Sequence, residues 1–295
     1  MIQVLKNWTL PLAMLVGFIG ADWLSRLAFL TPYLIFLMLL LTFCKISWNQ
    51  LRIFPLHGWL LLAQLIGVII IYGSFSLYDK IVAQAVMACV ICPTATAAAV
   101  VTHKLGGSAA FVTTHTLLSN LCAALTIPLF LPFLGASAEV EFFSIFSKVF
   151  GKIFPLLILP ILVALLLNRY LPKMHFRLAH SGDTAFYLWV IALSIACGQV
   201  FQSLSAIAVE NRLLELGIAI GSLAICMLQF GVGRALGHPT ANSINAGQSL
   251  GQKNTIFAIW MSYTYLHPAA ALGPGCYIIW QNLLNSWQLW KAKRI

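Results

Sequence analysis

Residues 240–265 read TANSINAGQSLGQKNTIFAIWMSYTY, and Lys253 stands halfway along this otherwise uncharged segment. The segment is long enough to cross the hydrocarbon core of a bilayer, which is about 30 Å thick. A charge at the centre of such a helix costs about 2.5–3.5 kcal/mol on insertion scales. The alternative is a lysine near a helix end that reaches the headgroups, but apolar residues continue through Leu266. Lys253 is therefore predicted to lie inside the membrane.

The composition of the whole chain indicates the same environment. Of 295 residues, 61% are hydrophobic and 8% are charged, and the mean hydropathy is +0.92. Soluble domains carry about a quarter charged residues, so residues 1–295 are predicted to form a single membrane domain. The net charge of +10 does not favour nucleic acid as a partner, because the basic residues lie between and beside apolar segments and not on one polar face.

The apolar segments predict an all-α membrane protein with about ten transmembrane helices. The expected helices cover residues 8–25, 31–44, 58–77, 81–103, 108–134, 142–169, 183–203, 213–236, 240–265 and 267–290. The first segment follows Lys6 and resembles the front of a signal peptide. It continues past Trp23 without a small-residue cleavage site, so a retained helix is expected.

The distribution of charge predicts the orientation. With an even number of helices, both termini lie on one side, and most basic residues fall there: Lys6, Lys45, Arg52, Lys104, Arg169, Lys173, Arg177, Arg234, Lys291, Lys293 and Arg294. The opposite side holds Arg26, Lys80, Lys148, Lys152 and Arg212, together with the acidic residues Asp22, Asp79, Glu139, Glu141, Glu210 and Glu215. Loops rich in lysine and arginine remain in the cytoplasm, so both termini are predicted to be cytoplasmic.

Two of the predicted helices are interrupted, at residues 92–96 (CPTAT) and around residues 249–254 (SLGQKN). Pro93 removes a backbone donor from the first of these helices, and Gly251 weakens the other one. A proline kink alone is often only structural, but backbone groups freed in a bilayer must be satisfied by protein, ligand or water. The interruptions fall in the fourth helix of each five-helix half, which predicts two inverted repeats whose discontinuous helices 4 and 9 cross. Paired breaks predict a binding site at the midplane, and two facing helix N-termini favour an anion.

Polar residues gather at these breaks. They occur in residues 245–255 (NAGQSLGQKNT) and in residues 113–120 of the fifth helix (TTHTLLSN), where Thr116 and Asn120 share a face with Val112. His115 is either a packed, hydrogen-bonded histidine or a proton carrier, and Gln64 has similarly divided interpretations. No carboxylate lies in the middle part of a predicted helix. Lys253 is therefore neutral through desolvation, solvated by carbonyls and water, or paired with an anionic substrate.

Catalytic and metal-binding patterns are weak. Cys89 and Cys92 form a C-x-x-C, but no second pair or nearby histidine cluster completes a metal site, so small packing residues are expected. No acidic pair lies within a predicted span, and neither an H-E-x-x-H motif nor a suggestive serine–histidine spacing occurs. An enzyme is not expected, and no cofactor or metal is predicted.

Several stretches resemble the bile acid:sodium symporter family. Residues 92–102 (CPTATAAAVVT) look like the family's C-P-G-G-T-A-S-N-V-x-T, residues 251–255 (GQKNT) resemble G-M-Q-N-S, and residues 280–283 (WQNL) are similar to W-H-N-L. The resemblance implies a bacterial inner-membrane protein with panel helices over residues 8–44 and 142–203 and core helices over residues 58–134 and 213–290. It also implies alternating access and carboxylated or sulfated organic anions as substrates.

The departures from the family pattern concern sodium. The resemblance places the first sodium site at a serine–asparagine pair, a serine, a threonine and a glutamate, where this chain has Ala98, Ala99, Val112, Thr116 and Ser249. At the second site, Gln252 and Lys253 replace methionine and glutamine, whereas Gln64 is retained. Alanine and valine offer no oxygen ligands, so the first site is expected to be absent. At the second, the tethered Lys253 ammonium is expected to replace a bound cation.

The residues that the family turns toward its substrate are better kept, and the predicted substrate-binding residues are Thr94, Thr96, Lys253, Asn254, Gln281 and Asn282. The leading hypothesis is a sodium-independent transporter of a small organic anion, with Lys253 or His115 as a possible proton carrier. One alternative is a sodium symporter that uses a residual site of backbone carbonyls, Gln64 and Gln252. Another is a membrane sensor that does not transport.

Overall fold

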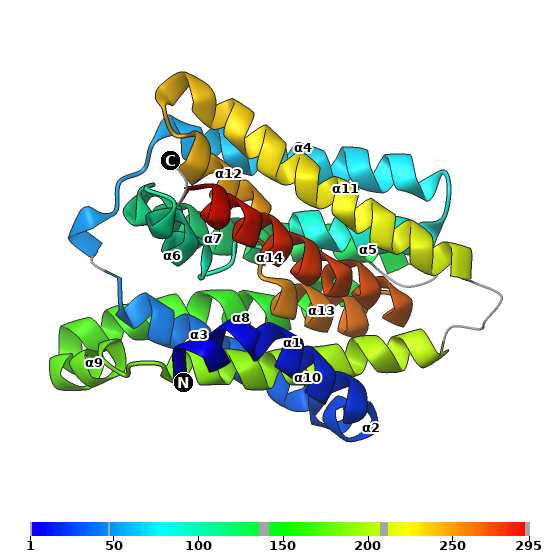
Figure 1. The fold of residues 1–295 in the computed structure, drawn as a ribbon, viewed down its shortest axis with the longest axis horizontal. Helices are drawn as coiled ribbons and strands as arrows, with labels where there is room; N and C mark the ends of the chain where they lie inside the picture. The colour runs from blue at the N-terminus through cyan, green and yellow to red at the C-terminus, as the bar shows by residue number, and fades with distance from the viewer. Residues whose placement is uncertain (1, 47, 136–141, 207–211, 293–295) are drawn as a thin grey trace.

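The computed structural model describes residues 2–46, 48–135, 142–206 and 212–292, and this part of the chain forms helices and connecting loops without β-strands (Figure 1). The long helices are α1 (Ile2–Ile19), α3 (Thr31–Cys44), α4 (Pro55–Ser76), α7 (Ala109–Gly135), α8 (Phe142–Tyr170), α10 (Thr184–Ala206), α11 (Arg212–Gly237) and α14 (Leu272–Ala292). Six segments of the described residues are long and apolar enough to cross a membrane: Ala21–Cys44, Pro55–Ser76, Ala109–Phe133, Phe142–Tyr170, Thr184–Gln202 and Arg212–Thr240. The chain is therefore an all-helical, multi-pass membrane protein.

Two predicted transmembrane helices are each divided into two shorter helices. The segment predicted over residues 81–103 consists of α5 (Lys80–Ile91) and α6 (Ala98–Lys104), and the one over residues 240–265 consists of α12 (Ser243–Gly251) and α13 (Thr255–Tyr265). Asp79 caps α5, since its carboxylate accepts hydrogen bonds from the backbone N–H groups of Ile81 and Val82 at 2.7 and 2.9 Å. Both interruptions therefore lie where the sequence predicts them.

Several boundaries differ from the prediction. The helix predicted over residues 8–25 is α1, which ends before Gly20, and it is followed by the short helix α2 (Ala21–Leu24) and the 3₁₀ turn η1 (Ser25–Leu30). The last helix begins later than predicted, because the 3₁₀ turn η5 (Pro268–Ala271) precedes it and the His267 ring caps that turn through the Ala269 N–H. The sequence analysis missed α9 (Pro172–Ala179), which is too short to span a bilayer, and the turns η2 (Trp48–Gln50) and η4 (His238–Thr240).

The helices form two layers in Figure 1. Helices α1, α3, α8 and α10 lie together in the lower layer of this view, and α4, α5, α11, α12 and α14 lie in the upper one. The first turn of α1 and the last turn of α14 are at the same end of the bundle. Of the charged residues used to predict orientation, Glu139, Glu141, Glu210, Lys293 and Arg294 lie outside the described residues.

Helices α11 and α12 approach each other backbone to backbone. A Cβ atom added to Gly233 on α11 would press against the carbonyl oxygen of Ala246 on α12, and one added to Gly251 would meet the ring of Phe230. By contrast, a Cβ atom on Gly231 would have no neighbour within 4 Å. The close packing of this pair holds the second break at a fixed place in the upper layer.

Candidate functional site

The two breaks bind each other. Residues Thr94 and Lys253 form an isolated antiparallel bridge, in which the Ala95 N–H donates to the Gln252 carbonyl and the Asn254 N–H donates to the Pro93 carbonyl, each at 2.9 Å. The Thr94 hydroxyl also donates to the Ser249 carbonyl at 2.6 Å. Each break therefore supplies partners for backbone groups that the other leaves free, which the interior of a bilayer requires.

Side chains from three other segments satisfy the C-terminal carbonyls of α5. The Lys253 ammonium donates to the carbonyls of Val90 and Cys92 at 3.0 and 3.1 Å. Gln64 of α4 donates to the carbonyls of Ile91 and Cys92 at 3.0 and 3.3 Å, and Gln229 of α11 donates to that of Cys89 at 3.2 Å.

The last turn of a helix carries unpaired carbonyls and the negative end of the helix dipole, so a cation is favoured there. The Lys253 side chain is 1% exposed, and its ammonium is held by carbonyl oxygens as a bound cation would be. Carbonyl oxygens are thus the partners of the Lys253 amine in the described residues.

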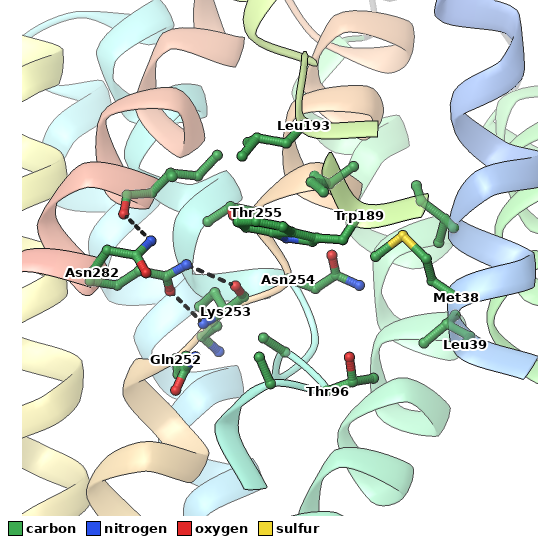
Figure 2. Close-up of a pocket in the computed structure, with 16 residues that line it drawn as sticks. Met38, Leu39, Thr96, Trp189, Leu193, Gln252, Lys253, Asn254, Thr255 and Asn282 are labelled. Atoms are coloured by element: carbon green, nitrogen blue, oxygen red, sulfur yellow. Dashed lines mark hydrogen bonds between the residues drawn. The ribbon is translucent and has the colours of Figure 1, made fainter. Parts of the chain in front are cut away.

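Helix α14 supports the second break. The Tyr277 hydroxyl donates to the Gly251 carbonyl at 2.6 Å and accepts a hydrogen bond from Gln229 at 3.0 Å. The Gln281 amide binds both backbone groups of Lys253: it accepts from the N–H at 2.9 Å and donates to the carbonyl at 3.4 Å (Figure 2). The backbone of Lys253 is thus fixed independently of its ammonium.

We expect Tyr277→Phe to destabilise the protein. The substitution leaves the Gly251 carbonyl without its hydroxyl partner in a buried site, and an unsatisfied buried group costs about 1–3 kcal/mol. The matched control is Tyr265→Phe, because the Tyr265 hydroxyl has no hydrogen-bond partner. Thermal unfolding of the purified variants in detergent measures the difference, and equal midpoints for the two variants would contradict the assigned role of Tyr277.

A cavity of about 90 Å³ lies against the breaks, between the two layers. The first break and α6 contribute Ala95, Thr96 and Ala97, and the second break and α13 contribute residues 252–256. Ile278, Gln281 and Asn282 of α14 complete this side, while α3 and α10 form the opposite side with Ile35, Met38, Leu39, Trp189 and Leu193. Figure 2 shows the Asn254 amide and the Thr96 hydroxyl pointing into the same space.

Five of the six predicted substrate-binding residues line this cavity: Thr96, Lys253, Asn254, Gln281 and Asn282. Thr94 does not line it, because its side chain is buried at the bridge between the breaks. The Asn254 side chain also caps α13 by accepting a hydrogen bond from the Phe257 N–H at 3.3 Å, and Asn282 donates to the Ile278 carbonyl at 2.7 Å. These two amides therefore border the cavity in fixed positions.

The positions aligned with the family's first sodium site are mostly apolar. Ala98 and Val112 are fully buried in a hydrophobic cluster with Leu56, Leu60, Phe111, Ala246 and Leu250. The Thr116 hydroxyl donates to the Val112 carbonyl of its own helix at 2.8 Å, and Asn120 donates to the Thr116 carbonyl at 2.7 Å. The Ser249 hydroxyl and the side-chain oxygens of Gln64 and Gln252 are buried without a partner.

A second buried histidine accompanies His115. The His57 Nδ1 accepts a hydrogen bond from the Phe54 N–H at 3.0 Å, and its Nε2 lies 3.2 Å from the Phe111 carbonyl. The rings of His57 and His115 are 5.9 Å apart, and both nitrogens of His115 are buried without a partner. The sequence analysis did not single out His57, although its place two residues after Pro55, close to a helix start, was a signal for a capping role.

The cysteines form no disulfide: Cys89 and Cys92 are free, as are Cys44, Cys122, Cys197, Cys226 and Cys276. Within the described ranges, no group of three or more histidine, cysteine, aspartate or glutamate side chains is arranged to hold a metal ion. The Cys89 thiol donates to the Ala85 carbonyl at 3.3 Å along its own helix, which is a packing arrangement.

The model of the sodium bile acid symporter family matches residues 31–212. The match includes α3 and α10, which form the apolar side of the cavity, and the whole first break, whereas the second break lies beyond it. No curated protein matches the chain.

Proposed function

The chain belongs to the sodium bile acid symporter family, and on that premise we propose that it is a secondary transporter of a small organic anion of the carboxylate or sulfate type. The family supports a membrane transporter of the bile acid or organic anion type, and not an enzyme. The observation that carries the proposal is the cavity at the two breaks, which lies between the two layers of helices.

The chemistry of the cavity supports an anionic substrate. Lys253 is the basic residue among those that line it, with its amine buried against the α5 carbonyls, and none of the lining residues is acidic. The N-terminal turn of α13 borders the cavity with its Phe257 N–H capped by Asn254, and the positive end of the helix dipole there favours an anion. Thr96, Asn254 and Asn282 add hydroxyl and amide groups for hydrogen bonds with carboxylate or sulfate oxygens.

The size of the cavity supports a substrate of few atoms. Its volume of about 90 Å³ is smaller than the engineered cavity of about 150 Å³ that holds one benzene molecule. A steroid nucleus is several times larger than benzene. In this conformation the cavity accommodates a short carboxylate or a similar small anion, and not a bile acid.

Transport proceeds by alternating access. Helices α1, α3, α8 and α10 act as the panel and the remaining long helices act as the core, so movement of one layer against the other exposes the cavity to alternate sides of the membrane. The two breaks belong to inverted repeats of five helices, as in carriers whose sites lie at the repeat interface. Both termini are in the cytoplasm, and the protein resides in a bacterial inner membrane.

Transport is independent of sodium. Ala98 and Val112 offer no oxygen ligands at the position of the family's first sodium site, and their surroundings are apolar. At the position of the second sodium site, the Lys253 ammonium donates hydrogen bonds to the α5 carbonyls. Sodium would need several oxygen ligands, and the ammonium already provides the positive charge. Protonation of Lys253 or His115 drives accumulation, or else the protein equilibrates its substrate without coupling.

Uptake of small carboxylates into proteoliposomes tests this function. We expect equal initial rates of uptake when external sodium is replaced by potassium or choline, because the Lys253 ammonium takes the place of a bound cation. Vesicles without protein provide the control for passive entry. A strict requirement for sodium would contradict sodium independence and favour the alternative described next.

The alternative with a specific observation in its favour is a sodium symporter with one residual site. The side-chain oxygens of Gln64 and Gln252 are buried without a partner beside the breaks, and such oxygens are ligands for an alkali cation. A non-transporting sensor is the other alternative, and it predicts carboxylate binding to the purified protein together with no flux in vesicles.

A further inference from the structure

A second pocket, of about 310 Å³, is formed by α8 and the last turn of α13, and it shares no lining residue with the cavity at the breaks. Two of its lining residues are basic and none is acidic, so the pocket favours an anion. Its lining consists of Ile145, Lys148, Val149 and Lys152 of α8 and Thr264 and Tyr265 of α13.

The two lysines are placed to bind one anionic group together. Lys148 and Lys152 are one turn apart on α8, and both side chains are exposed. Residues four apart in a helix share a face, with about 5–6 Å between their Cβ atoms, and like charges at this spacing repel each other. A phosphate group between the two ammonium groups accepts hydrogen bonds from both and removes this repulsion.

Tyr265 supplies a further donor from the facing helix. Its hydroxyl is buried and has no hydrogen-bond partner among the described residues, although a buried tyrosine hydroxyl usually has one. The neighbouring Thr264 hydroxyl is already engaged, because it donates to the Trp260 carbonyl at 2.6 Å. Tyr265 is therefore the residue on α13 whose hydroxyl is available for an oxygen of a bound anion.

The position of the lysines along α8 indicates the source of the anion. Residues 153–168, between Lys152 and Arg169, carry no charge and extend over about 24 Å at 1.5 Å per residue. This length is close to the thickness of the hydrocarbon core, which is about 30 Å. Lys148 and Lys152 therefore lie at the depth of the lipid headgroups on one side of the membrane, with Arg169 at the headgroups of the other side.

We propose that this pocket binds the anionic headgroup of a membrane phospholipid, whose phosphate accepts hydrogen bonds from Lys148, Lys152 and Tyr265. The acyl chains remain in the bilayer beside α8. The pocket has about twice the volume of the engineered cavity of about 150 Å³ that holds one benzene molecule, which leaves room for a phosphoglycerol group. Because α8 belongs to the panel and α13 follows the second break, the bound lipid connects the panel to the segment that carries this break.

Titration of the delipidated protein with lipid in a non-ionic detergent tests the site without any measurement of transport, so its outcome is separate from that of the proposed function. The unfolding temperature rises with the concentration of a ligand that binds the folded protein, which gives the affinity. We expect phosphatidylglycerol to bind at least about fivefold more tightly than phosphatidylcholine, whose choline group cancels the charge of the phosphate. Equal affinities for the two lipids would overturn the inference.

Soluble glycerol 3-phosphate separates a lipid from a free phosphate ester as the ligand. It offers a phosphate to the lysines but has no acyl chains, and we expect it to bind at least about tenfold more weakly than phosphatidylglycerol. Equal or tighter binding of glycerol 3-phosphate would overturn the assignment of the pocket to a lipid headgroup.

Replacement of both lysines tests the α8 side of the pocket. We expect Lys148→Gln combined with Lys152→Gln to lower the affinity for phosphatidylglycerol at least about fivefold and to remove the preference over phosphatidylcholine. The matched control is Lys80→Gln combined with Arg212→Gln, which removes the same charge from exposed residues that do not line the pocket. An unchanged preference in the lysine variant, or an equal loss in the control, would overturn the inference.

Tyr265→Phe tests the α13 side. We expect this variant to bind phosphatidylglycerol at least about twofold more weakly and to keep the wild-type unfolding temperature when no lipid is added, because its hydroxyl has no partner within the described chain. Tyr263→Phe is the control, since Tyr263 lies on the same helix and does not line the pocket. Equal affinities of the two tyrosine variants would remove Tyr265 from the site.

Discussion

Replacement of Lys253 by methionine is expected to reduce anion uptake by at least about tenfold. The ammonium makes two charge-assisted hydrogen bonds with the carbonyls of Val90 and Cys92, and hydrogen bonds with charged groups are worth about 1.5–3 kcal/mol each. Loss of these bonds leaves the α5 carbonyls without the lysine at the crossing beside the cavity, so the variant loses both the positive charge and a contact that holds the site together. Methionine has a similar length and keeps the packing, so the variant removes mainly the charge. Uptake of a small carboxylate into proteoliposomes measures the effect.

Two further substitutions separate the charge from the shape of Lys253. Lys253→Arg keeps a cation and is expected to retain more uptake than Lys253→Met. Lys253→Gln is also expected to reduce uptake, and because it frees the α5 carbonyls without supplying a charge, part of its activity is expected to return when sodium is added. Unchanged uptake in Lys253→Met would remove Lys253 from the mechanism.

Substitution of Gly233 by valine is expected to prevent stable folding. A Cβ atom at this position would press against the Ala246 carbonyl oxygen, and backbone cannot move aside as a flexible side chain can. Overpacking commonly costs about 1–3 kcal/mol, and separation of α11 from α12 would also disturb the second break, so the loss is at the upper end of this range or beyond it. The yield of monodisperse protein in detergent and its unfolding temperature measure the effect.

Gly231→Val is the matched control on the same helix. A Cβ atom there has no neighbour within 4 Å, so only the small cost of a branched residue in a helix is expected. If both variants fold equally well, the close approach of α11 and α12 does not limit stability.

The fold was predictable from the sequence where long apolar segments and strong breakers act together. Pro93 and Gly251 located both interruptions, because a missing backbone donor and a glycine both weaken a helix. By contrast, α9 is a short helix whose existence depends on packing at the ends of α3 and α8, and the boundaries of α1 depend on a local change at Gly20. Neither feature leaves a sufficient periodic signal in the sequence.

The candidate site was less predictable, because its geometry depends on contacts between distant segments. Residue types identified Lys253, Asn254 and Thr96 as polar groups in an apolar setting, but they did not show that the Lys253 ammonium binds α5 or that Thr94 points at Ser249. The partner atoms lie on the other half of the chain. His57 was overlooked for a related reason: its place near Pro55 indicates a helix start, but nothing in the sequence indicates that its ring lies beside that of His115.

The reciprocal pairing of the breaks has a consequence for biosynthesis. The ribosome completes α5 long before it reaches residues 249–254, so the newly inserted first half holds the Val90 carbonyl without the lysine that binds it in the finished protein, and the Cys92 carbonyl with Gln64 alone. Free carbonyls are poorly tolerated by lipid, and water or the insertion machinery must shelter them in the meantime. Insertion of α12 and α13 therefore supplies hydrogen-bond partners to the first break as well as to the second. The backbone groups of both breaks are satisfied within the bilayer only after this ninth predicted span is in place.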